Sequence, residues 1–244
     1  MGYCRPTALP VAEPVTLAQA KTFLRLPAGY TIQDTTITIL IQAAREKGEI
    51  LTGRSLAKRT FTMVLDSHPY YTDTVQSQLA YPPSYYSLPR YSTTLWNYSQ
   101  MIKLPMAPVI SVTAMRSIAP DGSVVTRNQD TDFILDRISE PARIFPKPGT
   151  YWPSDLYVAN ALEIDFVAGY DPDPTVVVTN TVAGSNPGQQ PTSVIVSGVP
   201  QLIRLGILNL VRFWFNGGEN GSVPSAIEDI FLSQAVIDFA PTRG

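Results

Sequence analysis

The chain has few charged residues and almost none of the side chains from which common catalytic and metal sites are built. Only 16% of its 244 residues are charged, against about 25% in an average soluble domain. It contains one cysteine, Cys4, and one histidine, His68. A single cysteine excludes an internal disulfide framework and cannot by itself form a structural zinc site. We therefore expect Cys4 to be a free thiol in a loose N-terminal arm.

Motifs for nucleophilic or phosphate chemistry are also missing. There is no glycine-rich phosphate loop, no Cys/His cluster and no glycine-flanked serine. His68 lies in a Ser-His-Pro turn, which favours a structural role. The carboxylate pairs Asp171 with Asp173 and Asp130 with Asp132 lack calcium-loop spacing and favour turns. The sequence predicts no catalytic residue, no metal site and no cofactor, although a carboxylate-only enzyme would leave little trace in it.

Charge and hydropathy indicate neither tight nucleic-acid binding nor membrane insertion. The formal net charge is −2, which gives no basic footprint for phosphates. No run of about 18 uncharged apolar residues could cross a bilayer, and no signal peptide is recognisable. We expect a protein made and kept in a cytoplasm until it is used. A surface poor in charge is typical of a subunit covered by neighbours, and a Ser/Thr/Asn-rich soluble surface explains it equally well.

Four helices are predicted, two near each end of the chain, over about 16–26, 34–52, 200–215 and 223–235. Thr16 and Gln19 form a capping box at the first helix, and Gly53 ends the second. Gly48 costs the second helix up to about 1 kcal/mol relative to alanine, so we expect another element to approach it closely. The helix after Pro200 is apolar on most of its surface and leaves only a narrow polar stripe.

Between these helices, over about 58–170, the hydrophobic period changes to alternation, as in Phe61, Met63 and Leu65. This pattern predicts a small antiparallel sheet or sandwich. The whole chain, 1–244, is therefore predicted to be a single α+β domain, in which N- and C-terminal helices pack as a small bundle and a β region is inserted between them.

Two projecting segments, 67–100 and 171–198, interrupt the β pattern. The first contains seven of the 12 tyrosines, together with Pro82-Pro83, and favours contact with a partner over self-packing. In the second, two valine-rich runs flank a Gly/Pro/Gln/Asn-rich tip, and it looks like a β-hairpin. An uncharged strand edge of this kind invites pairing with a neighbour.

Short packing and turn motifs follow one another along roughly two-thirds of the chain. The most specific block is N-terminal: Thr16-Leu17, Lys21, Leu24-Arg25-Leu26, Asp34, Ile37, Leu40-Ile41, Ala43-Ala44-Arg45, Glu49 and Thr52-Gly53-Arg54-Ser55-Leu56. Later motifs are Leu104-Pro105, Pro108-Val109, Ser111-Val112, Asp121-Gly122, 133–136, 141–144, Trp152-Pro153, Ile164-Asp165-Phe166, Ala168-Gly169-Tyr170 and Val199-Pro200. In their order and spacing the chain resembles the head-tail connector (adaptor) proteins of tailed double-stranded DNA bacteriophages.

This resemblance implies a structural virion protein of the neck and not an enzyme. Its copies would form a dodecameric ring between the portal protein and a tail-side stopper or tail tube protein. DNA would pass through the lumen without specific binding, and assembly would take place in the host cytoplasm. The C-terminal segment of such proteins docks on the portal, and the β loops face the tail.

These expectations give two sets of partner-binding residues. The portal-side set is Ile227, Ile230, Phe231 and Phe239, and the set facing a neighbour or the tail is Tyr81, Tyr85, Tyr86, Val177 and Ile195. Deleting residues 223–244 is expected to leave a folded monomer that no longer binds the portal. The alternatives are a sugar- or peptide-binding module, with the tyrosine-rich segment stacking on its ligand, and an enzyme without a recognisable motif.

Overall fold

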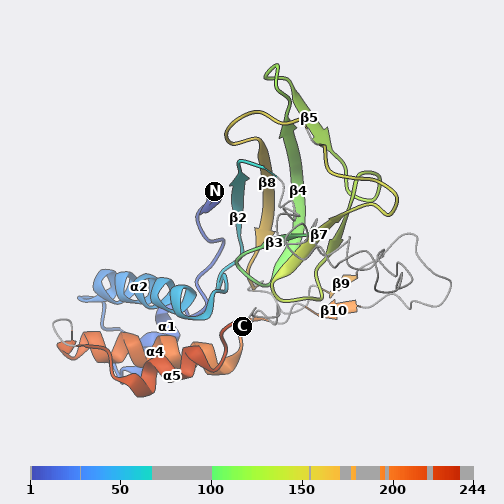
Figure 1. The fold of residues 1–244 in the computed structure, drawn as a ribbon. Coiled ribbons are helices and arrows are strands. Elements are labelled where there is room, and N and C mark those ends of the chain that lie inside the picture. Colours follow the sequence, from blue (N-terminus) through green and yellow to red (C-terminus); the bar gives the residue numbers. More distant parts are fainter. Residues whose placement is uncertain are drawn as a thin grey trace, which may run out of the picture.

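The computed structural model describes residues 2–27, 29–67, 101–153, 155–170, 177–179, 193–195, 198–218 and 222–236. Helices from both halves of the chain form one bundle, and antiparallel sheets stand beside it (Figure 1). Except for one N-terminal strand, the strands come from the sequence between the two pairs of helices. The predicted α+β fold class is confirmed.

The bundle consists of α1 (Leu17–Phe23), α2 (Asp34–Thr52), α4 (Gln201–Phe215) and α5 (Ser225–Leu232). At α1 the Gln19 backbone N–H donates to Thr16 Oγ1 at 3.2 Å, and the Thr16 N–H donates to Gln19 Oε1 at 3.0 Å, which completes the predicted capping box. Gly53 ends α2 in the left-handed conformation, with φ of 67°. Pro200 and Pro224 immediately precede α4 and α5.

The centre of the helical core is the ring of Phe231, which is fully buried. It lies against two helical glycines: a Cβ added to Gly48 of α2 would meet the ring at 2.7 Å, and one added to Gly206 of α4 would meet it at 2.8 Å. Both glycines therefore let the aromatic ring of α5 approach the backbones of the two longer helices. The close approach predicted at Gly48 is confirmed.

The β region consists of two principal antiparallel sheets. The larger, in the order β1-β2-β8-β4-β5, is built from β1 (Gly2–Pro6), β2 (Arg59–Leu65), β8 (Leu162–Ala168), β4 (Val109–Ile118) and β5 (Val124–Arg127). The smaller, in the order β3-β7-β6, is built from β3 (Ile102–Leu104), β7 (Ala142–Pro146) and β6 (Phe133–Asp136). A separate pair joins β9 (Val177–Thr179) to β10 (Ser193–Ile195).

Alternate side chains of the two larger sheets share a hydrophobic core distinct from that of the helices. Phe61 on β2 and Phe166 on β8 are register partners, and their rings stack with centroids 5.5 Å apart. Leu104 and Ile144, from the smaller sheet, are fully buried in the same cluster. The alternation read from Phe61, Met63 and Leu65 thus identifies the core face of β2.

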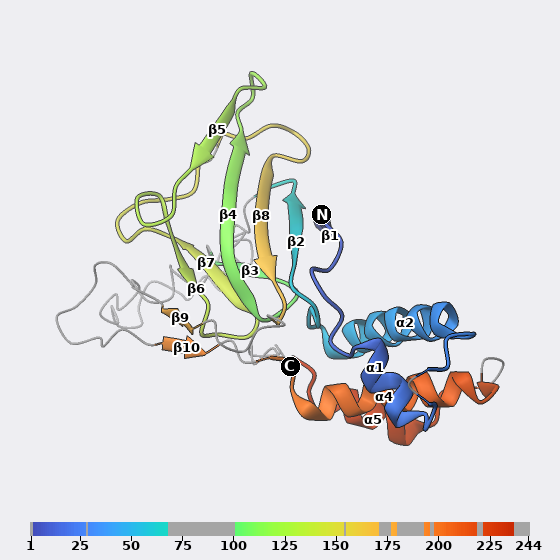
Figure 2. The same cartoon turned by 180° about the vertical axis from the view of Figure 1, so that it is seen from behind.

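The prediction of a loose N-terminal arm is wrong for Gly2–Pro6, which forms β1 at the edge of the larger sheet (Figure 2). Cys4 lies opposite Met63 and packs against the β core. Burial raises the pKa of the Cys4 thiol to about 11, although Arg59 opposes the shift. The thiol is therefore protonated at neutral pH. The strand forms because the seven-residue β2 offers a complete row of backbone partners, which no local pattern in β1 reveals.

Two groups of charged side chains lie between the bundle and the β region. In the first, the carboxylate of Glu49 in α2 accepts hydrogen bonds from Arg45 Nη1 at 2.9 Å, Arg59 Nη2 at 2.5 Å and the Leu56 N–H at 3.0 Å. Burial raises the pKa of Glu49, against the attraction of Arg59 and Arg45. We call Arg45, Glu49 and Arg59 the Glu49 cluster.

The second group is centred on Arg54, directly after α2. Its guanidinium donates to both carboxylate oxygens of Glu140, at 2.9 and 2.6 Å, in the turn between β6 and β7. Its Nε donates to the carbonyl of Gln234 at 2.7 Å, and the Val236 N–H donates to the Thr52 carbonyl at 2.8 Å. One arginine thus connects α2, the smaller sheet and the chain beyond α5.

Candidate assembly surface

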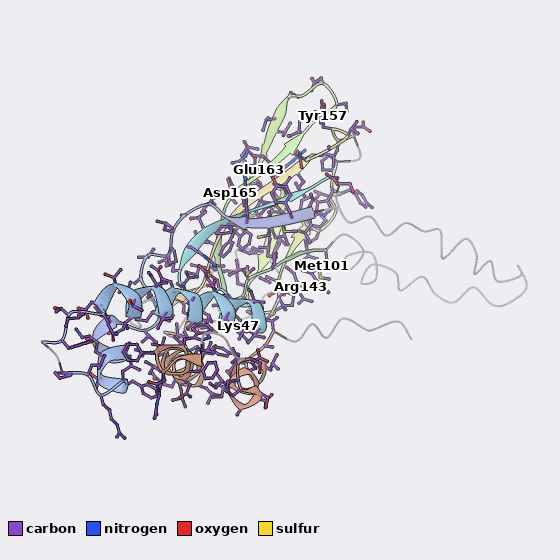
Figure 3. The ribbon with its side chains drawn as sticks, turned by 90° about the vertical axis from the view of Figure 1, so that its left-hand side faces the viewer. Lys47, Met101, Arg143, Tyr157, Glu163 and Asp165 are labelled. Carbon is purple, nitrogen blue, oxygen red and sulfur yellow. The ribbon has the colours of Figure 1, made fainter. Side chains whose placement is uncertain are left out.

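One open apolar surface of the bundle follows α4. One side of this helix is in the helical core, whereas Leu202 and Leu205 on the other side are 42% and 41% exposed. Figure 3, in which α4 and α5 are seen almost end-on, shows α4 lying between α1 and α5. The exposed side of α4 therefore includes apolar side chains as well as the polar residues of the predicted stripe.

A shallow groove of about 660 Å³ runs between the C-terminal half of α4 and the start of α5. Its lining includes Asn209, Arg212, Phe213, Asn216, Ile227 and Ile230. Apolar side chains thus stand beside amide and guanidinium donors. This combination suits a protein segment that buries apolar side chains and leaves some polar groups to be paired. We call it the α4–α5 groove.

A second groove, of about 360 Å³, lies on the other side of α4, against α1. It is lined by Val15, Gln19, Phe23, Gln201, Arg204, Leu205 and Leu208, and an adjoining hollow of about 350 Å³ also involves Ala18 and Thr22. At its polar end Arg204 Nη2 donates to Gln19 Oε1 at 3.0 Å. We call this the α1–α4 groove.

The predicted portal-side residues fall into three different places. Ile227 and Ile230 are half-buried and line the α4–α5 groove. Phe231 points into the core and is fully buried, so it cannot contact a partner while the bundle is intact, and we do not retain it as a contact residue. The amphipathic pattern of α5 could not separate core positions from exposed ones, because the glycines that receive Phe231 are distant in sequence. Phe239 lies outside the described residues.

The residues predicted to face a neighbour or the tail are mostly outside the described part of the chain. Tyr81, Tyr85 and Tyr86 belong to the segment 68–100, which the structure does not describe. Val177 and Ile195 are register partners in the β9–β10 pair. This pairing is the β-hairpin contact predicted for the segment 171–198.

Sequence reasoning missed the residues of the α1–α4 groove, among them Phe23, Leu205 and Leu208. The sequence feature that could have indicated the groove is the apolar character of α4, which extends over more sides than three neighbouring helices can cover. Predicting the groove would have required knowing that α1 is only seven residues long and leaves part of α4 open.

The surface along α4 consists of apolar grooves with polar edges. Among the described residues, no group of three or more His, Cys, Asp or Glu side chains is placed to hold a metal ion. In the same part of the chain, no helix is long and apolar enough to cross a membrane. Both grooves instead combine apolar side chains with hydrogen-bond donors that would need partners once covered.

No family model matches the chain, and no curated protein matches it. Solved structures do. A chain in the neck of an empty GTA particle computed with C6 symmetry has a TM-score of 0.63 and 16% identity, covering 99% of this chain and 100% of the other. A chain in the neck of a native GTA particle computed with C12 symmetry gives the same values. A chain in the virion of a native gene transfer agent (GTA) particle has a TM-score of 0.62 and 16% identity, covering 99% of each. This chain therefore shares the fold of those chains over almost its whole length.

Proposed function

We propose that the chain is a structural subunit of a phage-like virion neck, in which its copies form a ring between the portal and the tail. The observation that carries the proposal is the likeness in fold to chains of GTA necks, which leaves almost no part of either chain unmatched. The C6 and C12 symmetry of those necks supports a ring, and we propose a dodecamer. The role is structural and not catalytic.

A neck ring surrounds the path of the genome, and the charge of this chain suits that position. With a formal net charge of −2, the subunit has no excess of cations with which to retain passing phosphates. We accordingly propose that DNA passes through the lumen without specific binding. Assembly would take place in the host cytoplasm.

The α4–α5 groove is the proposed portal-side surface, with Ile227 and Ile230 as its apolar contacts. Phe239 remains a predicted contact of the same side. For the neighbour or tail side, the proposal keeps Tyr81, Tyr85, Tyr86, Val177 and Ile195, the tail-side partner being a stopper or tail tube protein.

Native mass spectrometry of the chain, alone and with the portal protein of the same genome, tests this proposal. We expect a stoichiometric complex with the portal. Ile230→Arg should weaken it by about tenfold or more, because an arginine would have to be desolvated in an apolar contact. Ile230 lies outside the helical core, so the variant should fold normally.

The matched control is Ile32→Arg, which places the same charge on an exposed isoleucine outside the groove. It should bind the portal like the unmodified chain. Equal binding by both variants would contradict the portal-side assignment, and no complex with any portal would contradict the neck proposal. Deleting 223–244 is a poorer test than the sequence suggested, because it also removes Phe231 from the core.

A further inference from the structure

The exposed side of α2 carries a ridge of residues spaced three or four apart, of which only one is charged: Thr35, Ile39, Gln42, Glu46 and Ile50. Ile39 is 58% exposed and Ile50 is 79% exposed, so the ridge presents two apolar side chains to solvent. The ridge lies across the helix from the buried residues Ile37 and Ile41. It therefore faces away from α4 and is not needed for packing within the molecule. We call it the α2 ridge.

The charges on the α2 ridge and in the α1–α4 groove are complementary. Glu46 carries the negative charge of the ridge, and its side chain is 65% exposed. Glu46 forms an ion pair with Arg45 at 3.3 Å. The same guanidinium also pairs with Glu13 and with Glu49, both at the shorter distance of 2.9 Å. Arg204 in the groove donates to a neutral amide, and among the described residues no ion pair with a carboxylate is found for it.

The spacing of charged and apolar groups also matches. On the ridge, Ile50 follows Glu46 by four residues, and in the groove Leu208 follows Arg204 by four. Each pair spans one helical turn, about 6 Å along its axis. With Glu46 opposite Arg204 and the helices running in the same direction, Ile50 lies opposite Leu208, where Phe23 also contributes to the groove.

The ridge and the groove lie on different sides of the same bundle, so one molecule cannot pair them with each other. Two different surfaces of this kind can pair when the ridge of one copy contacts the groove of the next, in a head-to-tail arrangement. Repeated around a closed circle, this contact produces a ring. We propose that the α2 ridge of one copy docks into the α1–α4 groove of the next, with Glu46 paired to Arg204. This inference rests on the proposed neck ring and names the contact that would build it.

Charge reversal tests this pairing, with self-association measured by native mass spectrometry and sedimentation over a range of concentrations, alone and on the portal. Glu46→Arg and Arg204→Glu should each weaken association between copies by about tenfold or more, because each places like charges together. The double variant should restore most of it. Rescue cannot arise from misfolding, since two misfolded single variants would not correct each other.

Lys147→Glu is the matched control: it makes the same charge change at an exposed lysine of the β region, outside both grooves. It should leave association between copies unchanged. Rings that form equally well with either single reversal would overturn the ridge-to-groove contact while leaving the neck proposal intact. A chain that binds the portal but never associates with a second copy would overturn both the contact and the ring. A chain that neither associates with a second copy nor binds the portal would overturn the neck proposal itself.

Discussion

Replacing Phe231 by alanine should lower the free energy of unfolding by about 3–5 kcal/mol. The phenylalanine ring is fully buried and fills the space between the backbones of α2 and α4, at Gly48 and Gly206. Neither glycine has a side chain that could move into the vacated space, so the cavity should persist and the loss should lie at the upper end of this range. Denaturant unfolding followed by far-UV circular dichroism measures the effect.

The control for this prediction is the neighbouring residue in the same helix. Leu232 is 52% exposed, and Leu232→Ala should change the free energy of unfolding by less than about 1 kcal/mol. If Phe231→Ala were no more destabilising than Leu232→Ala, Phe231 would not be the centre of the helical core. It would then again be available as a partner contact.

The helices were predictable from sequence because their signals are local. Thr16 with Gln19 forms a capping box within one turn, and Gly53 ends α2 with its own backbone conformation. The core face of β2 was equally readable from alternation. Gly48 predicted that another element approaches α2 closely, but it could not predict that Phe231 is the residue in contact. Phe231 lies 183 positions later in the sequence.

The candidate surface was only partly predictable. The sequence pattern grouped Ile227 and Ile230, which line the α4–α5 groove, with Phe231, which is fully buried. Both grooves arise from the relative lengths and placement of helices, and no single helix encodes them. The strand β1 shows the same limit, because an edge strand is determined by the partner that it extends.

The Glu49 cluster leads to a second large effect on stability. Glu49→Leu should lower the free energy of unfolding by about 3–5 kcal/mol, because it leaves Arg59 buried without its carboxylate. Arg59 has little access to water, its side chain being 12% exposed, whereas Arg45 would keep Glu13 and Glu46 as partners. Chemical denaturation at neutral pH measures the loss.

The double variant Glu49→Leu with Arg59→Met should recover most of that loss. Burial raises the pKa of Glu49 despite two nearby arginines, so ionising this carboxyl in the folded protein costs free energy as the pH rises through the raised pKa. Arg59 adds a further cost, because its Nε has no hydrogen-bond partner among the described residues. Removing both charged groups removes both costs, whereas removing one leaves the other uncompensated. A double variant as unstable as the sum of the two single variants would show instead that the two groups contribute to stability independently.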